Sequence, residues 1–317
     1  MYDISFVIPA YNAEKTIKKC VESINDSNLN CEIIIVNDGS LDDTEKIIEE
    51  IRILHKNVKL INQINSGPNV ARYNGIKECS GKYIIFADSD DYFDSNVLSK
   101  AWNRLNNEDI DISEYTYSCV NGNVIQKIDI RNKKVFDDNV LIHFFRSKYS
   151  NNFLWNKIFK RELFDNVEFP KLFAGEDSCV LVQLFSKAKS YISYNEGIYY
   201  YVNNENGLCN SPVSLKSLDE IKADYFKLDF IKNNNKFFIS DVAVAACGHI
   251  SITFDKIYYS SIDKKDNYLK ELIDDFKYFK KFYSIFSKSF LACSFYRKCS
   301  IMIFCFSPIF HAKMHKI

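Results

Sequence analysis

The sequence predicts an α/β protein in which helices flank a mostly parallel, Rossmann-like sheet. The chain opens with three strand–loop–helix units and a fourth strand, and each expected strand is a short apolar run. Strands that alternate with helices in this way pack as a parallel sheet wound on both sides, and such sheets bind ligands at the carboxyl ends of their strands. The expected strands are 4–8, 32–36, 58–61 and 83–86.

A turn and then a helical stripe follow each of the first three strands. The turns, at 9–12, 37–40 and 65–68, are rich in Asn, Asp, Ser, Gly or Pro. Apolar residues then recur at helical spacing. They are Ile17, Cys20, Val21 and Ile24 in the first unit, Ile47, Ile48, Ile51 and Leu54 in the second, and Val70 and Ile76 in the third.

The remainder of the chain is less regular. Residues 115–130 alternate around Asn121-Gly122 and predict a β-hairpin. Residues 138–147 predict a helix, and another helix is expected to start after Gly175. From 206 to 275 the apolar spacing is helical and no chemical motif is present. We therefore expect one domain at 1–205 and a mainly helical C-terminal region at 206–317.

The fourth strand runs directly into a cluster of three carboxylates, Asp88, Asp90 and Asp91. Carboxylate oxygens at a strand end suit a hard divalent cation such as Mg²⁺ or Mn²⁺. A calcium loop of the EF-hand type is excluded, because Phe93 and Ser99 stand where that loop requires Gly and Glu. The alternative to a metal site is an acidic turn that caps the next helix.

Composition argues against several classes of protein. Only nine glycines are present, with no Gly-x-Gly-x-x-Gly after the first strand and no Walker lysine loop, so dinucleotide and P-loop sites are not expected. The ten cysteines include no Cys-x-x-Cys pair, which predicts reduced thiols in a cytoplasmic protein rather than a zinc site. Because a core strand is expected from residue 4, no signal peptide is expected.

Charge is distributed unevenly along the chain. Residues 276–317 contain eight Lys or Arg and no Asp or Glu, whereas 1–275 hold 41 acidic and 33 basic residues. This tail is also rich in large apolar residues, but its stretch at 301–310 is too short to span a membrane. We expect either peripheral contact with the anionic inner face of the cell membrane or a helix pair packed on the domain. No nucleic-acid-binding motif accompanies the charge, so nucleic acid is not an expected partner.

Six blocks of sequence, in order along the chain, carry a resemblance to a known family. They are 6–12, 34–40, 65–67 with Ala71-Arg72, 81–91, 155–163 and 175–177. With these blocks the chain resembles the nucleotide-sugar glycosyltransferases of family 2, of the A-type fold and the bacterial surface-polysaccharide type. The resemblance covers roughly the first two thirds of the chain. It makes 1–205 the nucleotide-sugar-binding and catalytic domain.

The resemblance implies a donor site at the strand ends. Asp38 would accept a hydrogen bond from uracil, and Asp88 would lie near the ribose and the metal. Asp90, with Asp88 nearby, would bind Mn²⁺ or Mg²⁺, which neutralises the leaving diphosphate. For Arg72 the alternative is an ordinary surface arginine. The residues implied to bind the nucleotide are Pro9, Tyr11, Asp38, Arg72 and Asp88.

On the acceptor side, the resemblance makes Asp177 the general base that removes a proton from the attacking hydroxyl, with Glu176 orienting Asp177 or touching the acceptor. A single displacement of this kind inverts the anomeric carbon. Without the resemblance, both residues are expected to cap the following helix. Trp155 is expected to stack on a sugar or to lie in the core. Lys157 is expected to reach the diphosphate or to be solvated.

The expected function is an inverting, metal-dependent transfer of a hexosyl or N-acetylhexosaminyl group. The donor is a UDP-sugar, and the acceptor is a hydroxyl of a glycan or lipid-linked glycan in the synthesis of a capsule, lipopolysaccharide or teichoic acid. The alternative is a catalytically silent, sugar-nucleotide-binding or scaffold subunit of a glycan-assembly complex. All four implied carboxylates are present, which favours the enzyme.

Overall fold

The chain forms two compact units in a computed structural model that describes residues 2–137, 139–146, 152–203 and 218–314. The first unit comprises Met1–Lys171 and Val180–Asn210, and the second comprises Leu172–Cys179 and Ser211–Ile317. The expected boundary between residues 205 and 206 lies outside the described residues and stays a prediction. Nine cysteines lie within the described residues and all are free thiols.

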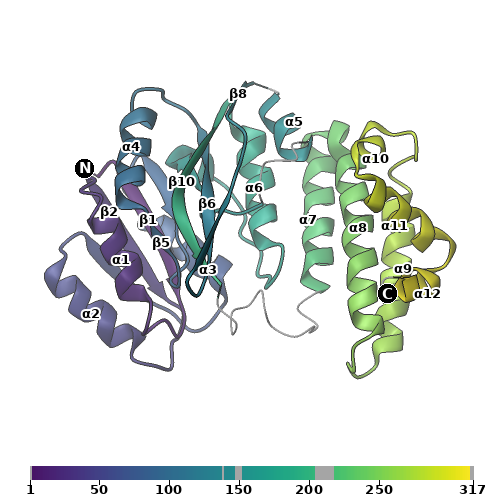
Figure 1. Cartoon of the computed structure of the whole chain (residues 1–317), viewed down its shortest axis with the longest axis horizontal. Helices are drawn as coiled ribbons and strands as arrows, with labels where there is room; N and C mark the ends of the chain where they lie inside the picture. The colour runs from purple at the N-terminus through teal and green to yellow at the C-terminus, as the bar shows by residue number, and fades with distance from the viewer. Residues whose placement is uncertain (1, 138, 147–151, 204–217, 315–317) are drawn as a thin grey trace. The chain divides into compact units, whose positions relative to one another are not determined.

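A ten-stranded sheet forms the centre of the first unit (Figure 1). Its strand order is β3-β2-β1-β4-β9-β6-β10-β5, with β7 paired to β6 and β8 to β10. Neighbouring strands among β1 to β4 run parallel, as predicted, and β10 is parallel to β6. Strand β9 lies antiparallel between β4 and β6. The strands are β1 Ile4–Ala10, β2 Cys31–Asn37, β3 Val58–Asn62, β4 Tyr83–Phe86, β5 Tyr92–Phe93, β6 Ile112–Asn121, β7 Val124–Ile128, β8 Lys133–Phe136, β9 Lys157–Lys160 and β10 Ser190–Val202.

Helices cover both faces of this sheet. Strand β1 is buried along its whole length, and its alternate residues point to opposite faces. Ile4, Phe6 and Ile8 belong to a core shared with α1, α2 and α4. On the other face α3 approaches closely, since a Cβ at Gly75 would come 2.5 Å from Cγ1 of Val7. The helices are α1 Ile17–Asn25, α2 Thr44–Leu54, α3 Pro68–Lys77, α4 Ser95–Leu105, α5 Asn139–Arg146, the 3₁₀ turn η1 Arg161–Phe164, and α6 Glu176–Lys187.

The predicted hairpin is confirmed. Asn121 of β6 pairs with Val124 of β7, which leaves a two-residue turn. Gly122, the first residue of that turn, has a φ of 57°, in the left-handed region that tight hairpin turns require. The helix expected at 138–147 is α5, and residues 138 and 147 lie outside the described part of the chain.

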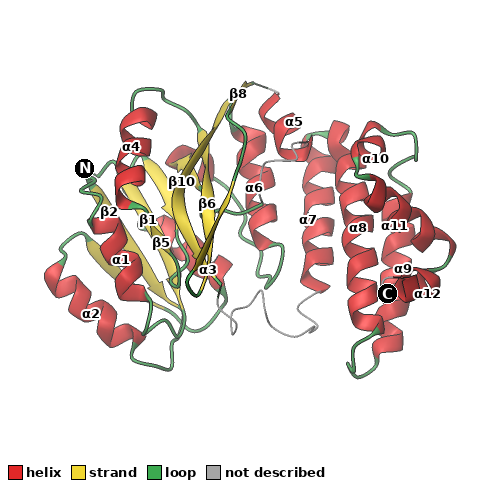
Figure 2. Cartoon of the chain, viewed as in Figure 1, coloured by secondary structure: helices red, strands yellow, loops and turns green. Residues whose placement is uncertain are grey.

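The described part of the second unit is helical, as predicted for the C-terminal region (Figure 2). Helix α8 is central in this unit and contacts every other helix from α7 to α12. Within the described residues, Lys236–Tyr258 is the one helix long and apolar enough to cross a membrane by length and composition, and 67% of its apolar window is buried. The helices are α7 Asp219–Asn234, the 3₁₀ turn η4 Lys236–Phe238, α8 Ile239–Tyr258, α9 Lys265–Lys280, α10 Lys288–Ala292, α11 Phe295–Phe306 and α12 Pro308–Met314.

Glu32 is a buried charge that ties the amino ends of three strands together. Its Oε1 accepts hydrogen bonds from Oγ of Ser5 at 2.7 Å and from the backbone N–H of Ser80 at 2.6 Å. Its Oε2 lies 2.8 Å from Nζ of Lys59. Burial raises the pKa of Glu32, but the hydrogen bonds from Lys59, Ser5 and Ser80 outweigh it and lower the pKa to about 2.

We expect Glu32→Gln to destabilise the fold most at neutral pH. A carboxyl whose pKa falls on folding stabilises the protein above its unfolded pKa of about 4.3, and this stabilisation is lost as the pH falls toward about 2. The free energy of unfolding should drop by about 3 kcal/mol at neutral pH, and the difference should shrink below about pH 4. Urea unfolding over this pH range measures it. Glu49→Gln, at an exposed pair with Arg52, is the control and should cost less than about 0.5 kcal/mol. A pH-independent loss at Glu32 would contradict the assignment.

Candidate functional site

The carboxyl ends of β1, β2 and β4 lie side by side at one edge of the sheet. Tyr11 directly follows β1, Asp38 directly follows β2, and Asp88 follows β4 by two positions. The backbone N–H of Asp38 donates to the carbonyl of Ala10 at 2.8 Å, which joins the first two loops. The fold therefore gathers these three residues, which are distant in sequence, at the edge where parallel sheets bind ligands.

Arg72 connects α3 to the end of β4. Its side chain is 5% exposed, and Nη2 lies 2.9 Å from Oδ1 of Asp88. A surface arginine is therefore excluded. The ion pair orients the Asp88 carboxylate and places a guanidinium, a planar donor for phosphate or carboxylate oxygens, beside the strand end.

Residues 88–91 form an acidic turn that β10 holds in place. The N–H of Asp88 donates to Oη of Tyr199 at 3.0 Å, and this hydroxyl donates to Oδ2 of Asp91 at 2.8 Å. The N–H of Val202 donates to Oδ1 of Asp91 at 2.7 Å. Asp91 is thus a buried internal acceptor, whereas Asp88 and Asp90 are only partly buried. Of the three carboxylates, these two are the ones placed to meet a ligand.

The negative charge of the acidic turn comes from Asp88 and Asp90. Burial, together with the charges of these two residues, raises the pKa of Asp91 to about 9, so that this carboxyl is protonated at neutral pH. A divalent cation would offset this charge, and carboxylate oxygens are ligands that Mg²⁺ and Mn²⁺ accept, so the residues present fit such an ion. Within the described residues, no three His, Cys, Asp or Glu side chains are placed to hold a metal. The remaining ligands would be diphosphate and water oxygens, as is usual for Mg²⁺.

Asp38 is buried and fixes the loop that leads into α3. Its Oδ1 accepts from the N–H of Ser66 and from Nε2 of Gln63, both at 2.7 Å, and its Oδ2 accepts from the N–H of Gly67 at 2.9 Å. A carboxylate offers roughly four acceptor positions, so about three are used within the protein. The uracil contact implied for Asp38 stays a prediction, and it would have to coexist with this structural role.

Pro9 and Tyr11 differ in what they offer a nucleotide. Pro9 is buried in β1 opposite Val36. Tyr11 is 48% exposed at the strand end. An exposed aromatic ring suits stacking on a base, which is worth about 1–3 kcal/mol in nucleic-acid sites. The nucleotide contact stays a prediction for both residues, and Tyr11 is the better placed.

Trp155 lies in the core. It is 4% exposed, and its ring stacks on Phe153 and Tyr199 at centroid distances of 4.8 and 4.6 Å. The ring of Tyr117 packs against it edge-on at 4.7 Å. Of the two expectations for Trp155, this geometry favours the core position over contact with a sugar.

Lys157 is fully buried, contrary to both expectations for it. Its Nζ donates to the carbonyl of Phe153 at 2.8 Å and to Oδ1 of Asn156 at 2.9 Å. The same atom lies 3.3 Å from Oε1 of Glu114, which is also fully buried. Lys157 is therefore neither solvated nor placed to reach a diphosphate, because its charge is needed to neutralise Glu114.

Glu176 and Asp177 occupy the first turn of α6, as expected for a helix start. They belong to the segment Leu172–Cys179 of the second unit. Gly175 before them has a φ of 75°, and a Cβ there would come 2.9 Å from Cβ of Ala223 in α7. The glycine is thus needed for both the turn and the packing on α7. The general-base role of Asp177 stays a prediction.

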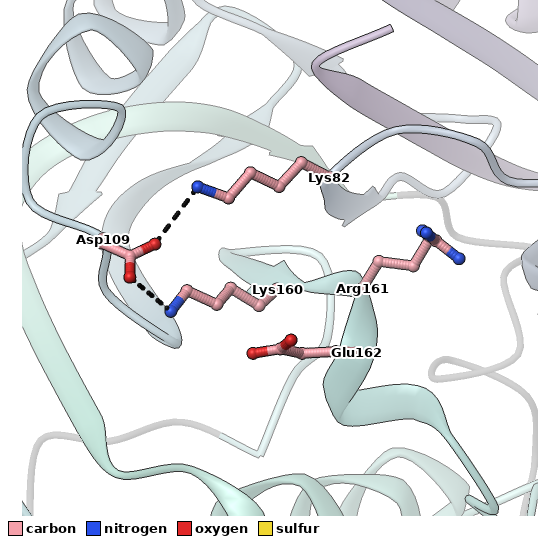
Figure 3. A pocket seen from close by; sticks show the side chains of 5 residues that line it. All are labelled: Lys82, Asp109, Lys160, Arg161 and Glu162. Atoms are coloured by element: carbon pink, nitrogen blue, oxygen red, sulfur yellow. Dashed lines mark hydrogen bonds and ion pairs between the residues drawn. The ribbon is translucent and has the colours of Figure 1, made fainter. Parts of the chain in front are cut away.

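A separate polar pocket of about 380 Å³ opens at the other end of β4 (Figure 3). It is lined by Lys82, Asp109, Lys160, Arg161 and Glu162. Asp109 lies 3.2 Å from Nζ of Lys82 and 3.2 Å from Nζ of Lys160. Because Lys82 precedes β4 and Asp88 follows it, this pocket is remote from the acidic turn. Its lysines already pair with a carboxylate, so we do not place the functional site here.

A mostly parallel sheet whose strand ends carry an acidic turn, with a buried arginine paired to Asp88, fits an α/β fold that binds a nucleotide at this edge. Residues 5–179 match the family described as Glycosyl transferase family 2, which is more than half of the chain. The chain therefore belongs to glycosyl transferase family 2, and the predicted resemblance is confirmed.

Relatives of this chain include larger proteins. Glycosyltransferase GlyA of Streptococcus pneumoniae is 28% identical over 209 residues, which cover 62% of this chain and 30% of GlyA. Poly(ribitol-phosphate) beta-glucosyltransferase of Bacillus spizizenii is 31% identical over 212 residues, 64% of this chain and 33% of that protein. The matched region thus spans about a third of each relative.

A solved structure shares the fold. The S. aureus TarS 1-349 fragment, crystallised in complex with UDP-GlcNAc, aligns with a TM-score of 0.58 and 18% sequence identity. The alignment covers 88% of this chain and 90% of the fragment. The predicted fold class, with its mostly parallel central sheet and helical C-terminal region, is confirmed.

Sequence reasoning missed the two residues that hold the acidic turn. Asp91 was grouped with its neighbours as a candidate ligand, yet it is 2% exposed and bonded to β10. Tyr199 was not singled out, although its hydroxyl joins Asp88 to Asp91. The available signal was weak: a run of three tyrosines at 199–201 gives no indication of which hydroxyl is buried.

We expect Tyr199→Phe to loosen the acidic turn. Without the hydroxyl, the partly buried N–H of Asp88 and the buried carboxyl of Asp91 each lose a partner, which should lower the free energy of unfolding by about 1–3 kcal/mol. UDP affinity in the presence of Mn²⁺ should weaken several-fold, as measured by calorimetry.

Tyr200→Phe is the matched control, because the Tyr200 hydroxyl is 3.5 Å from Asp94 and the residue is only partly buried. It should change the free energy of unfolding by no more than about 0.5 kcal/mol. Equal effects in the two variants would show that the hydroxyl of Tyr199 has no special role.

Proposed function

We propose that this protein transfers a hexosyl or N-acetylhexosaminyl group from a UDP-sugar to a hydroxyl of a glycan or lipid-linked glycan in the synthesis of a surface polysaccharide or teichoic acid. Family membership and a glucosyltransferase relative support sugar transfer. The fold shared with TarS, crystallised with UDP-GlcNAc, supports a UDP-sugar donor. The observation that carries the proposal is the placement of Asp38 and Asp88 at the carboxyl ends of the two strands that flank β1, with Arg72 of α3 paired to Asp88.

The donor end of the reaction requires that UDP be held while its diphosphate gains charge. The exposed ring of Tyr11 would cover the base, and Asp38 would keep the Ser66-Gly67 loop rigid beside it. Arg72, held by Asp88, would present its guanidinium toward the phosphates. Asp38, Arg72 and Asp88 are fixed by hydrogen bonds and an ion pair within the protein, so these residues need little reorganisation when the donor binds.

A divalent cation, Mn²⁺ or Mg²⁺, would be held by Asp90 and Asp88 and would neutralise negative charge on the diphosphate. The chain's own contribution is to keep the two carboxylates in place. Arg72 orients Asp88 through their 2.9 Å contact. Tyr199 and Val202 anchor Asp91, so the turn that carries Asp90 is fixed at its end.

The acceptor end requires a base. The acceptor oxygen bonds to the anomeric carbon while the carbon–oxygen bond to UDP breaks, and the hydroxyl proton passes to the carboxylate of Asp177. One displacement from the opposite face gives inversion. Asp177 lies in the first turn of α6, where free backbone N–H groups gather. Glu176 is the neighbouring carboxylate.

A panel of UDP-sugars tests this function directly. UDP release would be measured with Mn²⁺, with Mg²⁺ and with a chelator, first without an acceptor and then with glycan acceptors. Metal-dependent release from one sugar supports the proposal and names the donor. Tight UDP binding without turnover on any acceptor would indicate the silent scaffold subunit instead. Absence of UDP binding would overturn both.

Asp90→Asn should remove most of the metal-dependent UDP affinity. The variant keeps the size of the side chain but loses its charge, and the loss should be about 10-fold or more. Calorimetry with Mn²⁺ and with a chelator separates the metal-dependent part. Asp109→Asn, at the remote pocket, is the control and should bind UDP normally. Unchanged Mn²⁺-dependent affinity in Asp90→Asn would remove the metal assignment.

Asp177→Asn should lower turnover by about 100-fold or more while leaving donor binding nearly intact, because the base acts only on the acceptor. Turnover on the best acceptor and UDP affinity would be measured on the same folded sample. Glu176→Gln is the matched control in the same helical turn and should retain more activity. Loss of UDP binding with turnover would indicate a structural role, and normal turnover would place the base elsewhere.

A further inference from the structure

Helix α11 packs one side on the helices of the second unit. Ile301 and Phe304 are buried on that side. The ring of Phe304 lies 5.1 Å from that of Phe254 in α8 and 4.7 Å from that of Phe276 in α9. Packing on α8 and α9 accounts for the apolar residues on this side of α11. It does not account for the apolar residues on the opposite side.

The outward side of α11 is apolar as well. Phe295, Met302 and Phe306 are 83%, 42% and 88% exposed. These positions are seven and four residues apart, so they share one side of the helix and form a stripe, called here the outer stripe. A helix exposed on one side normally carries polar residues there. Two phenylalanine rings in water therefore indicate a surface that is covered by something else.

The segment that contains the outer stripe is rich in exposed apolar side chains. Of the 24 large apolar side chains exposed in the described residues, ten fall between 285 and 314, which is about a tenth of the chain. Single exposed apolar residues are ordinary, but a concentration of this kind marks an interaction surface. Outside the outer stripe these residues are Ile285, Phe286, Leu291, Tyr296, Ile309, Phe310 and Met314.

The charge of this segment indicates which partner its exposed apolar surface would bind. The described residues from 276 onward include seven Lys or Arg and no Asp or Glu, and Lys298 and Lys313 lie on α11 and α12 themselves. An anionic lipid surface attracts such basic segments electrostatically. A second copy of this surface would oppose it with like charge. Lipid is therefore the favoured occupant.

We propose that α11 and α12 dock this protein on an anionic lipid surface, with the outer stripe in the acyl boundary and Lys298 and Lys313 at the lipid phosphates. Helix α11 has 12 residues, whereas a span needs about 20, so it would lie in the plane of the interface. The proposal does not depend on sugar transfer. It would place the transferase where lipid-linked acceptors are found.

Vesicle binding by the full chain tests the proposal. Co-sedimentation would use vesicles of phosphatidylcholine alone and of phosphatidylcholine mixed with phosphatidylglycerol. The native chain should bind the mixed vesicles and lose binding at high salt. Phe295→Ser combined with Phe306→Ser should lower the partition coefficient by about 10-fold or more, because two exposed rings are removed. Both sites are exposed, so the fold should survive, which circular dichroism would check.

Two control variants separate the contribution of the apolar side chains from that of the basic side chains. Ile53→Ser with Leu54→Ser in α2 removes a pair that is 71% and 74% exposed and should bind vesicles normally. Lys298→Gln with Lys313→Gln should weaken binding to mixed vesicles and leave any binding to phosphatidylcholine unchanged.

Three outcomes would overturn the proposal. The first is equal vesicle binding by the native chain and the double phenylalanine variant. The second is no vesicle binding by the native chain. The third is a native oligomer, seen by sedimentation without lipid, that the phenylalanine substitutions dissociate, since this would make the surface an interface between copies.

Discussion

The concentration of three carboxylates at the end of β4 is the constraint on which the candidate site depends. Like charges repel, and the repulsion grows where water is excluded. The turn keeps its shape because partners come from distant parts of the chain: Tyr199 and Val202 from β10, and Arg72 from α3. Since β10 also pairs with β6 and with the short β5 that follows the turn, the sheet itself determines where Asp88 and Asp90 lie. The pairing of β10 within the sheet thus fixes the position of the carboxylates that would meet the ligand.

The parts of the fold that could be predicted are those with a local cause. Each of the first four strands is an apolar run, and the first three have their own turns and helices, so pattern alone identifies them. Strand β9 is different, because its four residues begin and end with lysine and yet are buried. Glu114 neutralises Lys157, and Asp111 lies 2.9 Å from Nζ of Lys160. No local window of sequence contains these partners, so Lys157 was expected at the surface or near the ligand.

The same reasoning applies to the candidate site, where motifs indicate location better than role. Asp38 and Asp88 were expected at the strand ends, and the strand order places them there. What each carboxylate bonds to depends on loops that meet only in the folded chain. Asp38 holds the backbone before α3, so removing it would disturb the loop whether or not it contacts a base. The effect of substituting Asp38 on nucleotide binding would not by itself distinguish the two roles. Asp90 is only partly buried, so its substitution tests the metal site more directly.

The second unit shows why apolar composition and membrane contact are separate questions. The segment Lys236–Tyr258 is the most membrane-like by length and hydropathy, but two thirds of its apolar window is buried, and core helices have the same composition. Helix α11 is too short to be identified as a membrane span by length and hydropathy. After folding, however, Phe295 and Phe306 remain in water while the buried side of the same helix packs on α8 and α9. Two features therefore distinguish a surface helix that fits lipid from an apolar core helix. They are the exposure of apolar side chains after folding and the absence of acidic residues from 276 onward.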